Sequence, residues 1–320
     1  MDTGRLIRRL ARRIGSRLAG AVAVVWGAAT LSFLALHLIP GNPVDALLGP
    51  NVAATPQLRQ TITADLQLDR PLWVQYLSSI QRVARLDFGR SYRLGRPVTD
   101  VVAAKIAPTA QLALAAFAVA VTLAVLLAVI AAISPPLVRS LISVVTLIGS
   151  SAPSFWVGII AISVFAFHLG WFPSSGTAGP AALVLPGITL GLPIGCVLAQ
   201  VIGPALDNAD EQPFATTVRA RGVSRLSTVL GHHLRHAAVP ALTLGGWTFA
   251  GFLGGAVLIE TVFGRAGLGR TLVDAITTRD IPVVTAITML AALAFVVVNM
   301  IVDLAALAAD PRTRISPTHD

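Results

Sequence analysis

The sequence predicts an all-α membrane protein, and two observations carry this prediction. Of the 320 residues, 55% are hydrophobic and only 12% are charged, whereas ordinary soluble domains carry roughly 25% charged residues. Six stretches also contain no Asp, Glu, Lys, Arg or His. At about 1.5 Å per helical residue, each is long enough to cross a hydrocarbon core of roughly 30 Å. The stretches are residues 18–36, 109–133, 140–167, 181–206, 237–259 and 281–302.

The first stretch predicts an uncleaved transmembrane helix over residues 18–39. Arginines crowd the preceding residues, as in a secretory signal, but the apolar stretch is longer than a signal core and no small-x-small cleavage site follows before Pro40. Placing these arginines in the cytoplasm leaves few arginines in the short outer loops, as the positive-inside rule requires. We therefore predict that residues 1–17 and 310–320 are cytoplasmic tails and that both termini are cytoplasmic.

Residues 40–107 are then an extracytoplasmic segment, which contains a predicted amphipathic helix. In "LDRPLWVQYLSSIQRVARLDFG", Leu72, Tyr76, Ile80 and Val83 recur at helical spacing, and the preceding proline suits a helix start. Such a helix suits the outer membrane surface or the surface of a partner protein. Packing in the core of a small outer domain is an equally good interpretation.

The other five stretches predict a core transmembrane domain over residues 108–309, which holds the second to sixth helices. The third and fourth stretches are long enough to need tilts or kinks, and candidate kinks lie at Pro153, Pro186, Pro193 and Pro204. The fifth stretch carries five glycines, a composition that favours close helix packing. These glycines are Gly245, Gly246, Gly251, Gly254 and Gly255.

A polar loop, residues 207–236, separates the fourth and fifth stretches and is cytoplasmic in this topology. Pro213 suits a first helical position, Gly222 suits a left-handed residue after a helix, and Ser224 suits the cap of a second helix that ends near His236. The pattern predicts a helix, a sharp turn and a helix, which we call the elbow (residues 213–236). It is equally compatible with docking into a cytoplasmic motor and with covering the end of the helix bundle.

Several function classes fit the residues poorly. The sole lysine, Lys105, lacks the glycine-rich context of a P-loop, so we expect no ATP site on this chain. The six stretches hold no carboxylate for ion coupling and no histidine base for an intramembrane hydrolase. The arginines are spread over separate loops, which argues against nucleic-acid binding. Cys196 is the only cysteine, so it cannot form an internal disulfide and suits a packing role.

The segment "ATTVRARGVSRLSTVLGHHLRHAAVPALTL" resembles the EAA loop of bacterial ABC-importer permeases, in the form found in the dipeptide and oligopeptide permease family. The resemblance places the ATPase-coupling positions on the elbow. These positions are Phe214, Thr216, Thr217, Val218, Arg219, Ala220, Arg221, Gly222, Val223 and Ser224. Thr216 stands where the signature has a glutamate, and Thr217 and Val218 stand where it has alanines. Other matching stretches, among them "DFGRSYRLGRPV" and "LIETVFGRAGLGRTLVDAITTRDIPVV", extend the resemblance from about Phe33 to Val284.

The resemblance implies the type I ABC importer permease fold, with six transmembrane helices, in the bacterial cytoplasmic (inner) membrane. It implies four kinds of partner: a second permease subunit, two ABC ATPase subunits, an extracytoplasmic substrate-binding protein and membrane lipid. ATP and Mg²⁺ would bind the ATPases, so this chain would bind no cofactor and would not be an enzyme by itself. The implied cargo is dipeptides or oligopeptides, and related systems carry glutathione, nickel complexes or sugars. The alternative function is a secondary transporter or channel that needs no ATPase.

The glycine-rich loop after the fifth stretch is a second candidate site. We expect it to form an outer gate or a contact with the substrate-binding protein. The residues that would do so are Glu260, Phe263, Arg265, Gly267 and Gly269. The competing interpretation is a glycine-rich turn with a solvated carboxylate at Glu260.

Three histidines lie in the second half of the elbow. His232 and His236 have the i, i+4 spacing of a metal site, but no nearby Cys, Asp or Glu completes one. We therefore expect no metal here and favour a face that is solvated or that contacts an ATPase.

Overall fold

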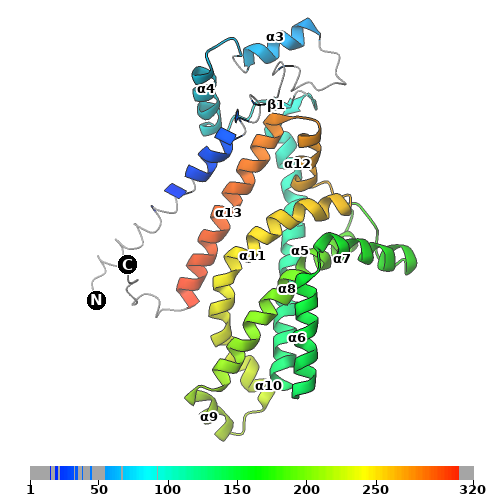
Figure 1. Ribbon diagram of the computed structural model, residues 1–320, viewed down its shortest axis with the longest axis vertical. Helices are drawn as coiled ribbons and strands as arrows, with labels where there is room; N and C mark the ends of the chain where they lie inside the picture. The colour runs from blue at the N-terminus through cyan, green and yellow to red at the C-terminus, as the bar shows by residue number, and fades with distance from the viewer. Residues whose placement is uncertain are drawn as a thin grey trace. The chain divides into compact units, whose positions relative to one another are not determined.

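The structure of the protein is a computed structural model in which helices make up nearly all of the secondary structure (Figure 1). It describes residues 55–65, 68–91 and 93–309, most of residues 19–34, and residues 15, 38 and 44. The chain divides into two compact units. The first unit comprises residues 1–107 and 267–297, and the second comprises residues 108–266 and 298–320.

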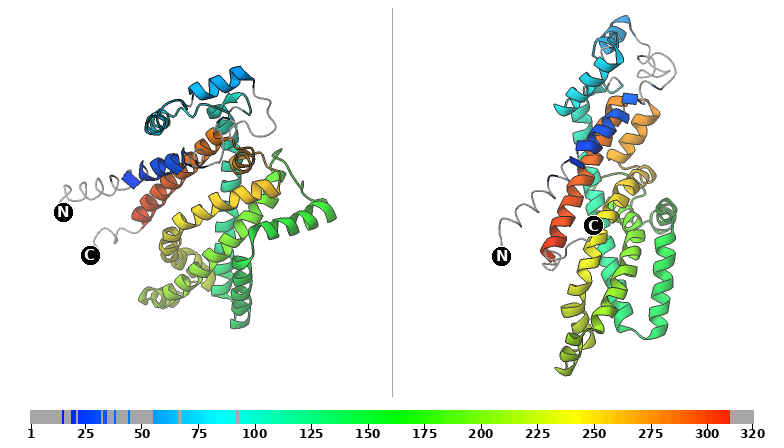
Figure 2. Two further views of the ribbon diagram at one scale, coloured as in Figure 1. Left: turned by 45° about the horizontal axis from the view of Figure 1, so that its top comes forward. Right: turned by 60° about the vertical axis from the view of Figure 1, so that its left-hand side comes forward.

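The second unit is a helical bundle, which Figure 2 shows in two further views. The segments are α5 (Val98–Ile133, in this unit from residue 108), α6 (Pro136–Ser151), α7 (Ser154–Ala161) with the π-helix η1 (Ile162–His168), α8 (Ala181–Asp210) and α11 (Leu234–Val262). Buried side chains from α5, α8 and α11, among them Leu112, Leu190 and Phe252, form its apolar core. Helix α7 projects sideways from this bundle in Figure 1.

Contacts within this bundle show that successive segments alternate in direction. Glycines along residues 187–195 of α8 approach residues 115–123 of α5 in the same order, so these two helices run in the same direction. Gly251 and Gly255 of α11 approach α8 side chains in the reverse order, so α11 runs against α8. Alternation of this kind is what consecutive membrane crossings require.

The third uncharged stretch forms a broken span. Pro153 separates α6 from α7, and the two helical parts are bent by 100°. The two helical parts nevertheless follow α8 along its length. Arg139 of α6 forms an ion pair with Asp207, and Gly158 of α7 approaches Thr189. At about 1.5 Å per residue, the part of α8 between these contacts is about 27 Å long. The predicted kink at Pro153 is confirmed as a sharp break that still crosses most of a hydrocarbon core.

Helices α5 and α8 approach so closely that glycine is required on α8. A Cβ atom added at Gly191 would lie 2.5 Å from the carbonyl oxygen of Ala116, and one added at Gly195 would lie 2.9 Å from that of Ala120. Small residues at four-residue spacing let membrane helices pack backbone against backbone. We call Gly187, Gly191 and Gly195 the glycine seam.

Two of the five glycines of α11 also pack closely, as the sequence predicts. A Cβ atom added at Gly255 would lie 2.6 Å from Leu190, and one added at Gly251 would lie 3.5 Å from Ile194. Gly254 has no described atom within 4 Å of an added Cβ. The surroundings of the other two glycines lie outside the described residues. The close approach to backbone atoms is at the glycine seam of α8, which the sequence alone does not indicate.

The first unit combines short helices with a two-stranded antiparallel sheet. Its elements are α3 (Pro56–Asp65), α4 (Leu72–Ala84), β1 (Arg90–Ser91), β2 (Arg96–Pro97), the start of α5, α12 (Leu268–Thr277) and α13 (Ile281–Ala309, in this unit to residue 297). The sheet pairs Arg90 with Pro97. Val98, Ala275 and Val283 belong to the apolar core of this unit, so residues far apart in the sequence meet there.

A buried hydrogen bond ties the sheet to the start of α13. The Ser91 hydroxyl donates to Asp280 Oδ2 at 2.5 Å, and both residues are buried. Burial raises the pKa of the Asp280 carboxyl, and the hydrogen bond from Ser91 opposes that rise because it favours the charged form. The bond therefore makes a buried carboxylate tolerable at the turn that begins α13.

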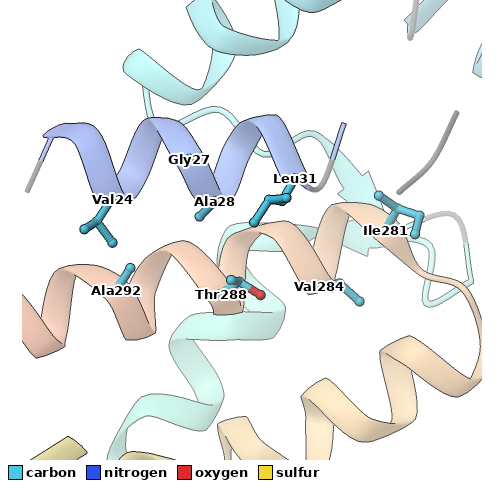
Figure 3. Close-up of a pocket in the computed structure, with 8 residues that line it drawn as sticks. All are labelled: Val24, Gly27, Ala28, Leu31, Ile281, Val284, Thr288 and Ala292. Carbon is cyan, nitrogen blue, oxygen red and sulfur yellow. The ribbon is translucent and has the colours of Figure 1, made fainter. Parts of the chain in front are cut away.

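The first predicted transmembrane helix lies beside α13 (Figure 3). It is described as an apolar helix over Val22–Leu31. Between the two helices lies an apolar groove of about 510 Å³, with Gly27, Ala28 and Ala292 among its lining residues. The small side chains leave this groove open, and no described atom lies within 4 Å of a Cβ atom added at Gly27.

Three helices are long and apolar enough to span a membrane among the residues that the structure describes. They are α5, α8 and the Ile281–Val302 part of α13, and the bent pair α6–α7 is a fourth. The fold is therefore helical and membrane-spanning, as the sequence predicts. The count of six helices and the cytoplasmic position of both termini stay predictions.

Candidate functional site

The elbow has the local geometry that its sequence predicts, at the lower end of the bundle in Figure 1. Helix α9 (Pro213–Ala220) starts with Pro213 in its first turn, and α10 (Arg225–Thr228) follows the turn. The Ser224 hydroxyl caps α10 by accepting a hydrogen bond from the Ser227 amide at 3.3 Å. The π-helix η2 (Val229–His233) then leads into α11. The predicted helix, turn and helix are thus present.

Gly222 makes the turn. Its φ is 75°, in the left-handed region that glycine adopts without strain. An added Cβ atom would meet no described atom within 4 Å. The requirement for glycine at this position therefore comes from the backbone conformation and not from crowding.

Asp210, at the end of α8, holds the elbow to the bundle. Arg219 donates to Asp210 Oδ2 at 3.3 Å and to the Asp210 carbonyl oxygen at 3.3 Å. On the other side, His233 Nε2 lies 3.7 Å from Asp210 Oδ1. Asp210 is therefore bonded to the first helix of the elbow and lies close to the histidine that leads into the second. The sequence does not indicate this role, because Asp210 precedes the EAA-like motif.

His233 is the buried member of this cluster, only 2% exposed. Burial lowers the pKa of its imidazole, while the Asp210 carboxylate acts in the opposite direction. Within the described part of the chain, its Nε2 atom has no hydrogen-bond partner. The imidazole is therefore favoured in its neutral form.

Phe214 packs the two halves of the elbow together. Its ring stacks on His236 with centroids 4.8 Å apart and meets His233 edge-on at 6.0 Å. Ala215, the next residue, is fully buried. His233 and His236 thus take part in aromatic packing. Both members of the candidate metal pair, His232 and His236, are exposed.

The remaining predicted coupling positions divide into an exposed and a half-buried set. The half-buried residues are Val218 and Val223. The exposed residues are Thr216, Thr217, Arg219, Ala220, Arg221, Gly222 and Ser224, with Leu226 and Leu230 exposed nearby. A hollow of about 470 Å³ adjoins them and is lined in part by Asp207, Arg225 and His233. The elbow thus offers a surface of mixed polarity next to a concave site.

The second candidate site is buried at the other end of the bundle. Glu260 and Arg265 are both 0% exposed. Glu260 accepts a hydrogen bond from the Thr109 hydroxyl at 2.5 Å. The competing interpretation of a solvated carboxylate is therefore wrong, because helices α5 and α11 enclose Glu260.

Arg265 connects segments that are far apart in the sequence. Its guanidinium donates to the carbonyl oxygens of Ala182 at 3.1 Å, Gly176 at 3.4 Å and Pro108 at 3.5 Å. Burial lowers the pKa of Arg265, and the negative charge of Glu260 opposes this effect. The arginine thus joins α5 at Pro108 and the start of α8 to the loop after α11.

The other residues predicted for this site fall into different places. Phe263 is buried in the core of the second unit. Gly267 caps the start of α12 and Gly269 lies within that helix, so both belong to the first unit. The structure therefore brings together Glu260, Phe263 and Arg265, and it adds Thr109, which sequence reasoning missed.

Comparison with known proteins shows the family of the chain. Residues 124–315 match the family of binding-protein-dependent transport system inner membrane components. The chain belongs to this family. A Brucella abortus (strain 2308) protein named as a candidate peptide transport system permease protein is 36% identical to this permease component over 307 residues, covering 93% of this chain and 97% of the relative.

A second relative has a different named cargo. The glutathione transport system permease protein GsiC of Escherichia coli (strain K12) is 34% identical to this permease component over 299 residues, covering 93% of this chain and 97% of the relative. Family membership makes this protein a membrane component of a transport system and not an enzyme. The sequence prediction of an ABC importer permease is confirmed at this level.

Proposed function

We propose that this permease subunit translocates peptides across the bacterial inner membrane and that the elbow couples it to partner ATPases. The observation that carries the proposal is the elbow itself, an exposed helix–turn–helix whose first helix is bonded to the end of α8 through Arg219 and Asp210. The named relatives transport peptides or glutathione, which is itself a short peptide. A second permease, two ATPases and an extracytoplasmic binding protein would complete the importer.

The elbow's geometry supports a mechanical role. Its exposed residues alternate small polar groups with Arg221, Leu226 and Leu230, a mixture suited to a protein contact. The elbow connects directly to α8 on one side and α11 on the other. Movement of an ATPase that holds the elbow would therefore be passed to both helices, and ATP-driven closure would change the side on which the bundle opens.

The topology follows from the same assignment. If the elbow faces the ATPases, the connection between α5 and α6 is also cytoplasmic, because Arg139 pairs with Asp207. The Glu260–Arg265 cluster then lies on the outer side, and residues 40–107 are extracytoplasmic. Both termini are cytoplasmic if the chain makes six crossings. The outer cluster would then be opened or rearranged when the bundle faces outward.

The decisive experiment replaces Gly222 in the assembled importer. Valine resists a positive φ, so Gly222→Val should distort the turn and abolish most uptake while ATP hydrolysis persists. Gly222→Asn is the matched control, because asparagine tolerates the left-handed region and should retain uptake. Amounts of the assembled complex in the membrane are measured for both variants. Unchanged uptake by Gly222→Val in a normal amount of complex would refute the coupling role.

The peptide cargo and the need for an ATPase are tested separately. Proteoliposomes with the permease pair, its ATPases and the binding protein should take up labelled peptides only when ATP is present. Dipeptides, longer peptides and glutathione are compared as cargoes. Uptake by this chain alone without ATP would instead support a secondary transporter or channel.

A further inference from the structure

Helix α4 of the first unit exposes an apolar face that neither peptide transport nor ATPase coupling uses. The face consists of Leu72, Trp73 and Leu77, whose exposed fractions are 61%, 66% and 51%. At 100° per residue these three side chains fall within one half of the helix surface. We call them the α4 face.

The less exposed side of α4 has mixed chemistry, because half-buried apolar residues such as Tyr76 and Ile80 accompany a buried amide. Gln75 is only 6% exposed, and its amide donates to the carbonyl oxygens of Arg70 at 2.8 Å and Leu68 at 3.4 Å. A helix on the surface of a water-soluble domain buries its apolar side and exposes its polar side. Helix α4 also exposes a tryptophan and two leucines, so its surroundings on the exposed side are not water alone.

Tyr76 fixes the level of α4 along the first transmembrane helix. Its hydroxyl lies 2.9 Å from Thr30 Oγ1, and its ring packs edge-on against Phe33 with centroids 5.4 Å apart. Thr30 and Phe33 both belong to the uncharged stretch of residues 18–36. Figure 1 shows α4 beside one end of this blue helix. A tyrosine that reaches into the stretch places α4 at the boundary between apolar core and headgroups.

We propose that the α4 face is a lipid-binding surface that lies in the boundary layer of the membrane. Tryptophan is enriched at this depth because its ring is apolar and its indole N–H can stay hydrated. The leucines would contact acyl chains. Arg70 and Arg85, exposed at the two ends of α4, suit the phosphates of lipid headgroups.

The small size of the face favours lipid over a protein partner. Stable protein interfaces bury roughly 800 Å² on each partner. Three side chains that are half to two thirds exposed offer well below that area. Lipid needs no minimum area, since it surrounds every apolar surface at this level. The inference stands apart from the cargo and from the coupling role of the elbow.

The test measures the depth of spin labels in the full chain. In a Cys196→Ala background, which removes the sole cysteine, single cysteines are introduced as Leu77→Cys and Leu72→Cys. Gln60→Cys, an exposed position on α3 of the same unit, is the control. Each variant is labelled with a nitroxide and reconstituted in phosphatidylcholine and phosphatidylglycerol nanodiscs. Collision rates with oxygen and with a water-soluble nickel chelate are then compared.

The expected result is a several-fold higher ratio of oxygen to nickel collisions at residues 72 and 77 than at residue 60. Oxygen concentrates in the membrane, whereas the chelate stays in water. Nickel collisions at residues 72 and 77 that match those at residue 60 would overturn the proposal, because the face would then be in water. Labels shielded from both reagents would also overturn it, since a protein surface would then cover the face.

Discussion

The helix core of the second unit and the elbow are both held by charged side chains, but in opposite ways. In the core, Glu260 and Arg265 are fully buried and bind partners on other helices. In the elbow, the ion pair between Arg219 and Asp210 is exposed. Removing one member of a buried pair is strongly destabilising, whereas exposed pairs contribute little. The cluster at Glu260 and Arg265 is therefore held more firmly than the elbow.

The largest effect should come from Arg265→Leu. The substitution leaves three backbone carbonyl groups without their donor and removes the positive charge that acts on buried Glu260. We expect a loss of about 3–5 kcal/mol in the free energy of unfolding. Titration of the purified chain with sodium dodecyl sulfate, monitored by circular dichroism, measures this loss.

Arg265→Lys separates charge from geometry at the same position. Lysine keeps the charge but lacks the planar fork that reaches several carbonyl groups at once. We expect the free energy of unfolding of Arg265→Lys to lie between those of the wild type and Arg265→Leu. If Arg265→Leu were as stable as the wild type, the contrast between core and elbow would be wrong.

Alanine substitutions at two glycines of α8 test how closely the core is packed. Gly191→Ala places a methyl group 2.5 Å from the Ala116 carbonyl oxygen, and overpacking of this kind costs about 1–3 kcal/mol. Gly203→Ala is the matched control, since no described atom lies within 4 Å of its added Cβ. There alanine should stabilise the helix by up to about 1 kcal/mol. A lower thermal unfolding midpoint for Gly191→Ala and a higher one for Gly203→Ala, each relative to the wild type, would support the close packing at the glycine seam.

The lowered pKa of His233 predicts that the stability of the elbow depends on pH. This pKa is lowered from 6.5 by burial, with Asp210 opposing that shift and Arg219, His232 and His236 adding to it. As pH falls below 6.5, the unfolded state takes up the proton more readily than the folded state, so the elbow should become less stable. Hydrogen exchange of the elbow amides above and below this pH measures the effect.

The control for this pH dependence is the neighbouring exposed residue. His233→Gln should reduce the acid-induced rise in exchange, while His232→Gln should leave it nearly unchanged. Equal responses in the two variants would assign the pH dependence to other groups.

The smallest effect is expected for Arg219→Ala. Its ion pair with Asp210 is exposed on both sides, so the loss should be about 0.2–1 kcal/mol. The same denaturation assay as for Arg265→Leu allows a direct comparison. A loss as large as that of Arg265→Leu would show that the elbow is fixed as firmly as the core.

Local chemistry made the elbow predictable, and long-range contacts made the core unpredictable. Pro213, Gly222 and Ser224 specify helix ends through their own backbone preferences, so the sequence alone predicted the helix, turn and helix. Thr109 and Glu260 are 151 residues apart, and no local pattern signals their hydrogen bond. The sequence shows the glycines of the loop at Glu260, and these favour a solvated turn. It does not show the buried partners of Glu260.

The same distinction holds elsewhere in the fold. Helical periodicity and a starting proline predicted α4, which the structure places at Leu72–Ala84. Proline marked the break at Pro153, but its angle of 100° depends on packing that the sequence does not display. Glycines of α11 stood out by number, whereas the glycine seam depends on which α5 residues lie opposite.

The glycine seam also has a mechanical consequence. Where two backbones touch with no side chains between them, there is little deformable material to absorb a push or a twist. Helices α5 and α8 would therefore move as one stiff strut. The elbow is attached to one end of this strut through Asp210, and Arg265 grips both helices at the other end through the carbonyls of Pro108 and Ala182. A force applied at one end would reach the other with little loss.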